Sequence, residues 1–150
     1  LSNDDVVLDA YCGIGTIALS LAKYVKKVYG VEIVDTAIND ARNNAKLNKI
    51  ENVEFKCDDA GKYMIELVNN NIHLDVVFVD PPRKGCSKEF LDYLIQAKPS
   101  KIIYISCDVA TQARDIKYLQ EFNYQVDMCQ PVDMFPHTTH IENIVRLKYK

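Results

Sequence analysis

A cysteine directly after a predicted strand is the most reactive candidate in the sequence. Cys107 follows the β-branched run 101–106, and a helix expected to begin near Thr111 would direct its positive end toward the thiol. A thiolate in that position can attack an electron-poor carbon and form a covalent intermediate. A lone cysteine at a strand end is more often a small core residue, so this residue alone leaves both interpretations open.

An acidic residue and two prolines follow another predicted strand, 76–79. Ligands of open α/β sheets bind at the carboxyl ends of the strands, and the stiff proline turn would hold Asp80 there as a hydrogen-bond acceptor. Amino-methyltransferases also carry Asp-Pro-Pro, but with an aromatic residue next, where this sequence has Arg83. Arg83 and Lys84 could bind a phosphate, or they could simply be solvated.

A loop with two glycines joins the first predicted strand to the first predicted helix. Gly13 and Gly15 allow a sharp turn and the close approach of a ligand to the helix N-terminus. Glu32 ends the next strand, where its carboxylate could accept hydrogen bonds from both hydroxyls of a ribose. The spacing also fits the fingerprint of dinucleotide-binding domains. A carboxylate at Asp9, however, would repel a pyrophosphate and attract the cationic methionine part of S-adenosylmethionine.

Two acidic residues follow the third predicted strand. Asp58 or Asp59 could accept a hydrogen bond from an adenine amino group, or could equally well cap the helix that follows. We therefore predict S-adenosylmethionine as the cofactor. The residues expected to bind it are Asp9, Gly13, Gly15, Glu32, Asp59 and Asp80.

The elements that must position these residues alternate along the chain. The predicted strands are 6–9, 27–31, 53–56, 76–79 and 101–106, and the predicted helices are 16–23, 34–48, 62–68, 88–96 and 111–121. This alternation predicts an α/β fold with helices on both faces of a mostly parallel sheet. Two more strands, 124–132 and 140–149, should pair as an antiparallel hairpin. A seven-stranded sheet of this kind is typical of class I S-adenosylmethionine-dependent methyltransferases, which have a Rossmann-like fold.

Composition and charge restrict the remaining possibilities. The 150 residues fit one domain, and 48% hydrophobic with 26% charged residues is ordinary for a globular protein. A net charge of -3 does not suit a polyanion-binding surface over the whole domain. Five scattered cysteines without a CxxC pair argue against disulfides and zinc, so we predict no metal and a cytoplasmic location. No apolar run approaches the roughly 20 residues that a membrane span needs.

The sequence resembles the RNA (uracil-C5) methyltransferase family, which modifies tRNA and 23S ribosomal RNA. Four segments that span nearly the whole chain carry the resemblance: LDAYCGIGTIAL, VDPPRKG, YISCDVATQARD and FPHTTHIENIV. The resemblance implies that Cys107 is the nucleophile, that Glu142 is the base and that Asp80 lies beside the target base. It also implies cofactor contacts for Glu32 and Asp59.

One departure from the family stands beside the nucleophile, where Asp108-Val109 replaces a frequent Asn-Pro. We expect the change to be tolerated. The reaction implied by the resemblance begins when Cys107 adds to C6 of uracil, which makes C5 nucleophilic enough to accept a methyl group. Glu142 then removes the C5 proton so that the cysteine can leave.

The resemblance further implies that residues 1–150 are the catalytic domain of a longer protein. We expect the RNA, either 23S ribosomal RNA or tRNA, to be bound mainly by preceding regions, and the protein to be monomeric. Alone, the domain is expected to methylate RNA poorly. Three alternatives stay open: an amino-methyltransferase that acts on a nucleic-acid base through Asp80, an NAD-binding oxidoreductase domain, and a non-catalytic domain with the same fold.

Overall fold

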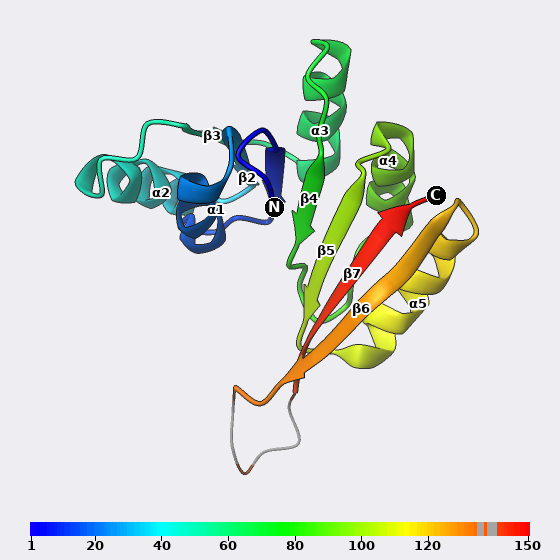
Figure 1. Ribbon diagram of the computed structural model, residues 1–150. Coiled ribbons are helices and arrows are strands. Elements are labelled where there is room, and N and C mark those ends of the chain that lie inside the picture. The colour runs from blue at the N-terminus through cyan, green and yellow to red at the C-terminus, as the bar shows by residue number, and fades with distance from the viewer. Residues whose placement is uncertain (135–136, 138–140) are drawn as a thin grey trace.

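Strands and helices alternate along the chain in the computed structural model, which describes residues 1–134, 137 and 141–150 (Figure 1). The strands are β1 (Val6–Ala10), β2 (Lys27–Glu32), β3 (Val53–Cys57), β4 (Val76–Val79), β5 (Lys101–Ser106), β6 (Tyr124–Val132) and β7 (Glu142–Tyr149). The helices are α1 (Thr16–Leu21), the 3-10 helix η1 (Ala22–Tyr24), α2 (Asp35–Leu47), α3 (Ala60–Asn69), α4 (Lys88–Ala97) and α5 (Val109–Gln120).

All seven strands form one sheet in the order β3-β2-β1-β4-β5-β7-β6. Neighbours among β1 to β5 pair in parallel, whereas β7 is antiparallel to both β5 and β6. The predicted fold class is therefore confirmed, including the C-terminal antiparallel hairpin. The second strand of the hairpin lies inside the sheet beside β5, and the first strand, β6, forms the edge.

Side-chain alternation along the central strands divides the core into two layers. Leu8 and Ala10 of β1 pack in a cluster with the buried residues of α3 and α4. Val7, between them, packs instead with residues of α1 and α2 on the opposite face. In Figure 1, α1 and α2 cover one face at the β1–β3 side of the sheet, whereas β5, β6 and β7 carry helices, α4 and α5, on one face only.

The strand ends that matter for function meet at one end of the sheet. β4, β5 and β6 end there and β7 begins there, toward the lower part of Figure 1. In the part of the chain that the structure describes, no helix is long and apolar enough to cross a membrane.

Candidate active site

A cavity of about 320 Å³ at this end of the sheet contains the three residues predicted to perform the chemistry. Asp80 follows β4, Cys107 follows β5 and Glu142 begins β7, and all three line what we call the edge cavity. Its other lining residues are apolar: Ile105, Val132, Met134 and Ile144. An apolar cavity of this size with a few convergent polar groups is the usual form of a small-ligand site.

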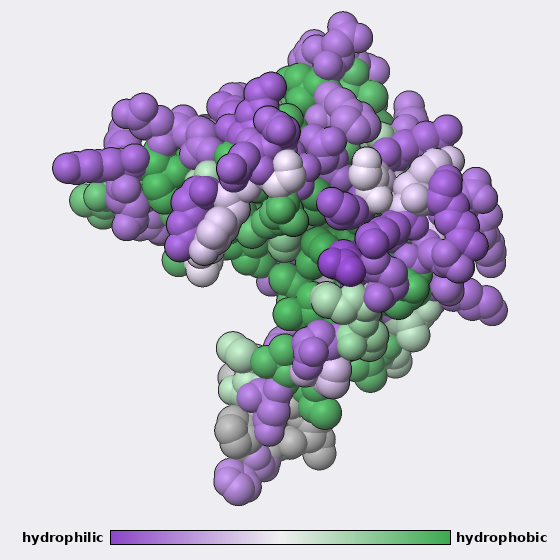
Figure 2. Space-filling model, viewed as in Figure 1, coloured by the Kyte–Doolittle hydropathy of each residue, from purple (hydrophilic) through white to green (hydrophobic). Residues whose placement is uncertain are grey.

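Strand pairing explains why these distant residues meet. Ser106 pairs with Asn143 at the last position of the antiparallel β5–β7 ladder. Cys107 follows Ser106 and Glu142 precedes Asn143, so the two candidates face each other across adjacent strands. Asp80 leaves the parallel neighbour β4 at the same edge. Figure 2 shows apolar surface gathered around this end of the sheet, below the polar helices.

The two carboxyl groups of the edge cavity interact. Partial burial raises the pKa of Asp80 above its ordinary value, and the nearby charge of Glu142 raises it further. Two carboxylates in one site disfavour the doubly ionised state, so one of them more readily holds a proton. Asp80 is therefore suited to exchange a hydrogen bond with a polar ligand atom in either protonation state.

Asp9 lies beneath the glycine loop, where its side chain stabilises the loop by a hydrogen bond to the start of α1. Its side chain is 1% exposed, and its Oδ2 accepts a hydrogen bond of 2.9 Å from the backbone N–H of Ala18 in α1. Burial raises the pKa of Asp9 to about 7; the bond from Ala18 lowers it in part, and the charge of Asp80 adds to the rise. Asp80 thus interacts with both Asp9 and Glu142 in an acidic series, and a cation bound beside these three side chains would favour their ionised forms.

Glycine occupies positions 13 and 15 of the loop for different physical reasons. Both have left-handed backbones, with φ of 53° at Gly13 and 88° at Gly15. A Cβ on Gly15 would lie 2.8 Å from the ring of Phe55, so packing excludes a side chain there. A Cβ on Gly13 would meet nothing within 4 Å, which leaves open space for a ligand.

The other two predicted cofactor residues are placed by the strand ends. The Glu32 carboxylate accepts from the N–H groups of Gly13 at 3.3 Å and of Ile33 at 2.8 Å, which ties β2 to the glycine loop. Asp59 caps α3 through a 3.0 Å bond from the N–H of Lys62, which confirms the capping interpretation. Glu32 also accepts from the N–H of Val34 at 3.1 Å, so of the about four hydrogen bonds that a carboxylate can accept it retains about one for a ligand, whereas Asp59 retains more.

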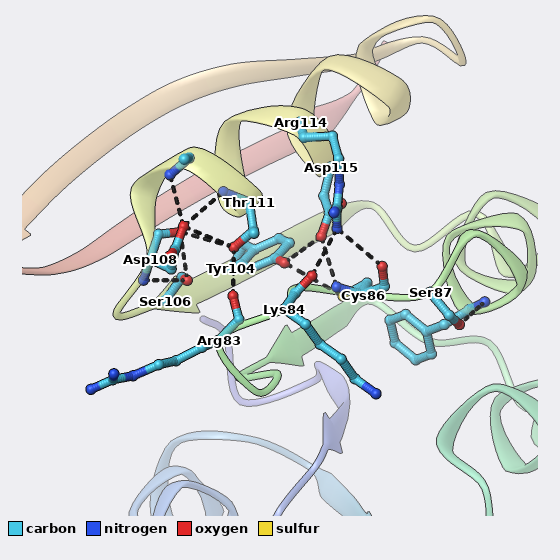
Figure 3. A network of polar contacts seen from close by, with 12 residues as sticks. Arg83, Lys84, Cys86, Ser87, Tyr104, Ser106, Asp108, Thr111, Arg114 and Asp115 are labelled. Carbon is cyan, nitrogen blue, oxygen red and sulfur yellow. Dashed lines mark hydrogen bonds and ion pairs between the residues drawn. The ribbon is translucent and has the colours of Figure 1, made fainter.

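A buried polar network, which was not predicted from the sequence, holds the loop after Asp80 against α5 (Figure 3). Asp115, 1% exposed, accepts hydrogen bonds from the Tyr104 hydroxyl at 2.7 Å and from the Cys86 N–H at 2.8 Å. Arg114 donates to Asp115 at 2.8 Å and to the carbonyl of Lys84 at 3.0 Å. The motif YISCDVATQARD contains three of these residues, but nothing in its spacing identifies their partners.

The start of α5 differs from the expectation. The helix begins at Val109 rather than near Thr111, and Asp108 caps it by accepting from the N–H groups of Ala110 at 3.1 Å and Thr111 at 2.9 Å. The backbone bond from Thr111 is the main cause of a lowered pKa at Asp108. A carboxylate therefore occupies the positive helix end that was expected to favour the Cys107 thiolate. The cap also shows that Asp108 gives this loop a defined conformation.

Arg83 and Lys84 have fixed backbones and extended side chains. The Thr111 hydroxyl donates to the Arg83 carbonyl at 2.9 Å, next to the Arg114 bond to Lys84. In Figure 3 both side chains point away from the network. Lys84 also lines a separate cavity of about 420 Å³ between α4 and α5, which contains none of the predicted site residues.

Comparison with known proteins gives consistent results. Residues 2–150 match the family model described as tRNA (Uracil-5-)-methyltransferase. An uncharacterized RNA methyltransferase of Listeria innocua is 51% identical over the whole chain, which corresponds to 33% of that protein. Another from Enterococcus faecalis is 50% identical over 98% of the chain and 32% of its own length. The chain thus spans about a third of the length of these relatives.

Solved structures show the same relationship. The tRNA (uracil-54, C5)-methyltransferase of Pyrococcus abyssi, in complex with S-adenosyl-L-homocysteine, superimposes with a TM-score of 0.84 and 35% identity, over 98% of this chain and 35% of that one. An rRNA methylase from Streptococcus thermophilus has a TM-score of 0.77 at 16% identity, over 99% and 89% of the two chains. The second similarity concerns the fold alone.

Proposed function

The chain belongs to the tRNA (uracil-5-)-methyltransferase family, and from that membership we propose that it is the catalytic domain of a longer enzyme that methylates C5 of a uridine in RNA. One observation carries the proposal beyond the family: Asp80, Cys107 and Glu142 line a single cavity. A nucleophile and a carboxylate base in one cavity are what C5 methylation of uracil requires.

The residues of the glycine loop and its neighbours fit S-adenosylmethionine as cofactor. The acidic series that includes Asp9 suits a cationic methionine group and opposes a pyrophosphate, and the space over Gly13 is open. Glu32 keeps acceptor capacity for one ribose hydroxyl and Asp59 for the adenine amino group. S-adenosylmethionine supplies, when bound, the electrophilic methyl group. The Pyrococcus abyssi relative was solved in complex with S-adenosyl-L-homocysteine, which is S-adenosylmethionine without its methyl group, and this supports the assignment.

Cys107 performs the activating step. Its thiolate forms a bond to C6 of uracil, and the electron pair of the C5–C6 double bond moves onto C5, conjugated as an enolate with the adjacent carbonyl. C5 becomes nucleophilic enough to accept the methyl group. Asp80, whose pKa is raised, is placed to hold a proton at a polar atom of the same ring.

Glu142 completes the reaction from the same cavity. After methylation C5 carries both a methyl group and a proton, and the carboxylate removes that proton. The electron pair of the C–H bond re-forms the C5–C6 double bond while the bond from C6 to sulfur breaks and Cys107 leaves as a thiolate. The RNA partner must present the uracil outside its stack, at a cost of a few kcal/mol. Either tRNA or 23S ribosomal RNA is compatible with this chemistry.

Trapping with 5-fluorouridine tests the proposal. The full-length protein, wild type and Cys107→Ala, is incubated with S-adenosylmethionine and with tRNA or 23S ribosomal RNA containing 5-fluorouridine, then run on a denaturing gel. Fluorine at C5 cannot leave as a proton, so wild type should form a covalent protein–RNA band and Cys107→Ala should form none. Cys57→Ala, an exposed cysteine outside the edge cavity, is the control and should behave as wild type.

The alternative activity gives a different result. An amino-methyltransferase that uses Asp80 needs no cysteine adduct, so it would transfer methyl groups in both variants without any trapped band. That outcome would overturn the uracil-C5 proposal and replace it with the amino-methyltransferase.

A further inference from the structure

A second cavity shares Cys107 with the edge cavity. This flank cavity, of about 380 Å³, is lined by Cys107, Val109, Cys129, Pro131, Ile141 and Asn143. Of these, only Cys107 also lines the edge cavity. The proposed chemistry uses the sulfur of Cys107 and does not use any other residue of the flank cavity.

Strand alternation places the two cavities on opposite faces of the sheet. Successive side chains of a strand point to opposite faces, and Glu142 and Ile144 of β7 line the edge cavity whereas Asn143 lines the flank cavity. On β6, Val132 lines the first and Pro131 the second. Cys107 stands just beyond the end of β5, where the two faces meet.

The floor of the flank cavity is held rigidly. The Asn143 side chain donates to Oε1 of Gln112 at 2.7 Å, and its Oδ1 accepts a bond of 3.5 Å from the Cys129 thiol. Gln112 is itself 1% exposed and donates to the Asn143 carbonyl at 3.0 Å. A site fixed in this way before binding loses little entropy when a ligand enters.

We propose that the flank cavity binds the nucleotide next to the target uridine, an inference that rests on the proposed function. Adjacent nucleotides are joined by one phosphodiester, so when the target base lies against Cys107 its neighbour must lie against a surface that continues from that residue. The flank cavity is such a surface. RNA would pass over the end of the sheet, with the target base on one face and the neighbouring base on the other.

The lining determines how the neighbour is recognised. Val109 is 55% exposed and Ile141 48% exposed, so both present apolar side chains to a ligand. The six lining residues described above carry no charged side chain, and the Asn143 amide is already engaged by Gln112 and Cys129. Contact is therefore with the flat face of a base rather than with its edges or its phosphate, and it tolerates different bases.

Adduct kinetics with modified RNA test this inference. The full-length protein is mixed with synthetic stem-loops that carry 5-fluorouridine at the modified position, and the rate of covalent adduct formation is measured. Removing the base on one side of the target should slow wild type by about tenfold, within the range for loss of one base-stacking contact. Val109→Ser and Ile141→Ser should slow the reaction with intact RNA by a similar factor. With the abasic RNA they should cause no further loss.

Controls separate binding from damage to the fold. Val126→Ser, at an exposed apolar residue of β6 outside both cavities, should react as wild type, and Val109→Ile, which keeps an apolar side chain, should lose less of the rate than Val109→Ser. Unchanged rates in Val109→Ser and Ile141→Ser would overturn this inference but not the proposed function. The same holds if these two variants slow the reaction of the abasic RNA as much as they slow that of intact RNA. Failure of wild type to form any adduct would overturn the proposed function and this inference with it.

Discussion

Gln112 makes hydrogen bonds to both strands that present the candidate nucleophile and base. Its amide nitrogen donates to the carbonyls of Tyr104 in β5 and Asn143 in β7, each at 3.0 Å. Its oxygen accepts from the Asn143 side chain at 2.7 Å. Glu142 directly precedes Asn143, and Cys107 lies three residues beyond Tyr104, so the bonds of Gln112 tie together the two strands that carry these groups.

Replacement of Gln112 by leucine should destabilise the chain through unsatisfied polar groups. The buried Tyr104 carbonyl would lose a donor and the partly buried Asn143 side chain its acceptor, which costs about 1–3 kcal/mol of unfolding free energy. Urea unfolding of the 150-residue chain measures the change. Gln120→Leu, at an exposed position of the same helix, is the matched control and should stay within about 0.5 kcal/mol of wild type. Equal effects of the two substitutions would contradict the role given to Gln112.

Asp9 should make the free energy of unfolding fall as pH rises, which is the opposite of the effect of a carboxyl group whose pKa is lowered by folding. Its pKa is about 7 in the folded chain against an ordinary 3.8, so between these values the folded chain keeps a proton that the unfolded chain has lost. Stability from this group is therefore present at low pH and falls as pH rises toward about 7. In Asp9→Asn that fall should be absent, so the variant gains stability relative to wild type at the alkaline end.

The measurement is the free energy of unfolding as a function of pH for both chains. The difference between them should grow by roughly a few kcal/mol across the window from 3.8 to about 7. Asp35→Asn, at an exposed residue in the first turn of α2, controls for loss of one negative charge. Parallel profiles for wild type and Asp9→Asn would show that Asp9 is ionised normally.

The loop between β4 and α4 owes its conformation to α5. Gly85 has φ of 76°, and its N–H donates to the Pro82 carbonyl at 2.8 Å to close a turn. A Cβ on Gly85 would lie 2.7 Å from both Nη2 of Arg114 and Oδ2 of Asp115. Asp115 is buried and bonded on several sides, so it cannot yield to such a side chain.

A pair of alanine substitutions separates backbone strain from collision. Gly13→Ala adds a side chain in open space and should cost about 1–2 kcal/mol from its left-handed backbone alone. Gly85→Ala has the same strain with the collision in addition, so its unfolding free energy should be clearly lower than that of Gly13→Ala. Thermal or urea unfolding of the two variants makes the comparison, and equal costs would mean that the network can rearrange.

Sequence reasoning predicted the elements well because each has a local signal. The strands 76–79, 101–106 and 124–132 have the bounds that were predicted, since β-branched runs and turn residues mark them directly. The meeting of Asp80, Cys107 and Glu142 followed from family resemblance and from the rule that parallel strands end together. The prediction for the segment 135–141 stays a prediction, because most of that segment lies outside the described residues.

Contacts between distant residues could not be predicted. Gln112 and Asn143 are 31 positions apart, and nothing in either neighbourhood marks them as partners. Their pairing depends on β7 lying between β5 and β6, which a hairpin pattern alone does not specify. The cap at Asp108 was missed because the helix was predicted to begin near Thr111, two residues after its observed start at Val109.

At the scale of the whole molecule, charge is the main constraint on RNA binding. The net charge is -3, and the edge cavity is acidic, so within this chain affinity for a polyanion must come from local cations. Arg83 and Lys84 extend from a fixed loop that contacts α5 next to its cap, Asp108. In the full-length protein, Arg83→Gln and Lys84→Gln should each weaken RNA binding at all sequences.

Salt dependence identifies the lost contacts. Each phosphate contact removed should reduce the slope of log affinity against log salt concentration by about 0.7 for single-stranded RNA. Lys117→Gln, an exposed lysine near the far end of α5, should leave the slope unchanged. If Arg83→Gln and Lys84→Gln also leave it unchanged, these two side chains are simply solvated.

The position of Cys107 between two cavities bears on chemical inhibition. An electrophilic fragment that fills the flank cavity would reach the sulfur from the face opposite Asp80 and Glu142. Such a covalent ligand would compete with RNA but not with S-adenosylmethionine, so cellular cofactor concentrations would not reduce its potency. Its selectivity would come from Val109, Ile141 and Pro131, which form no part of the cofactor loop that the fold shares with many other enzymes.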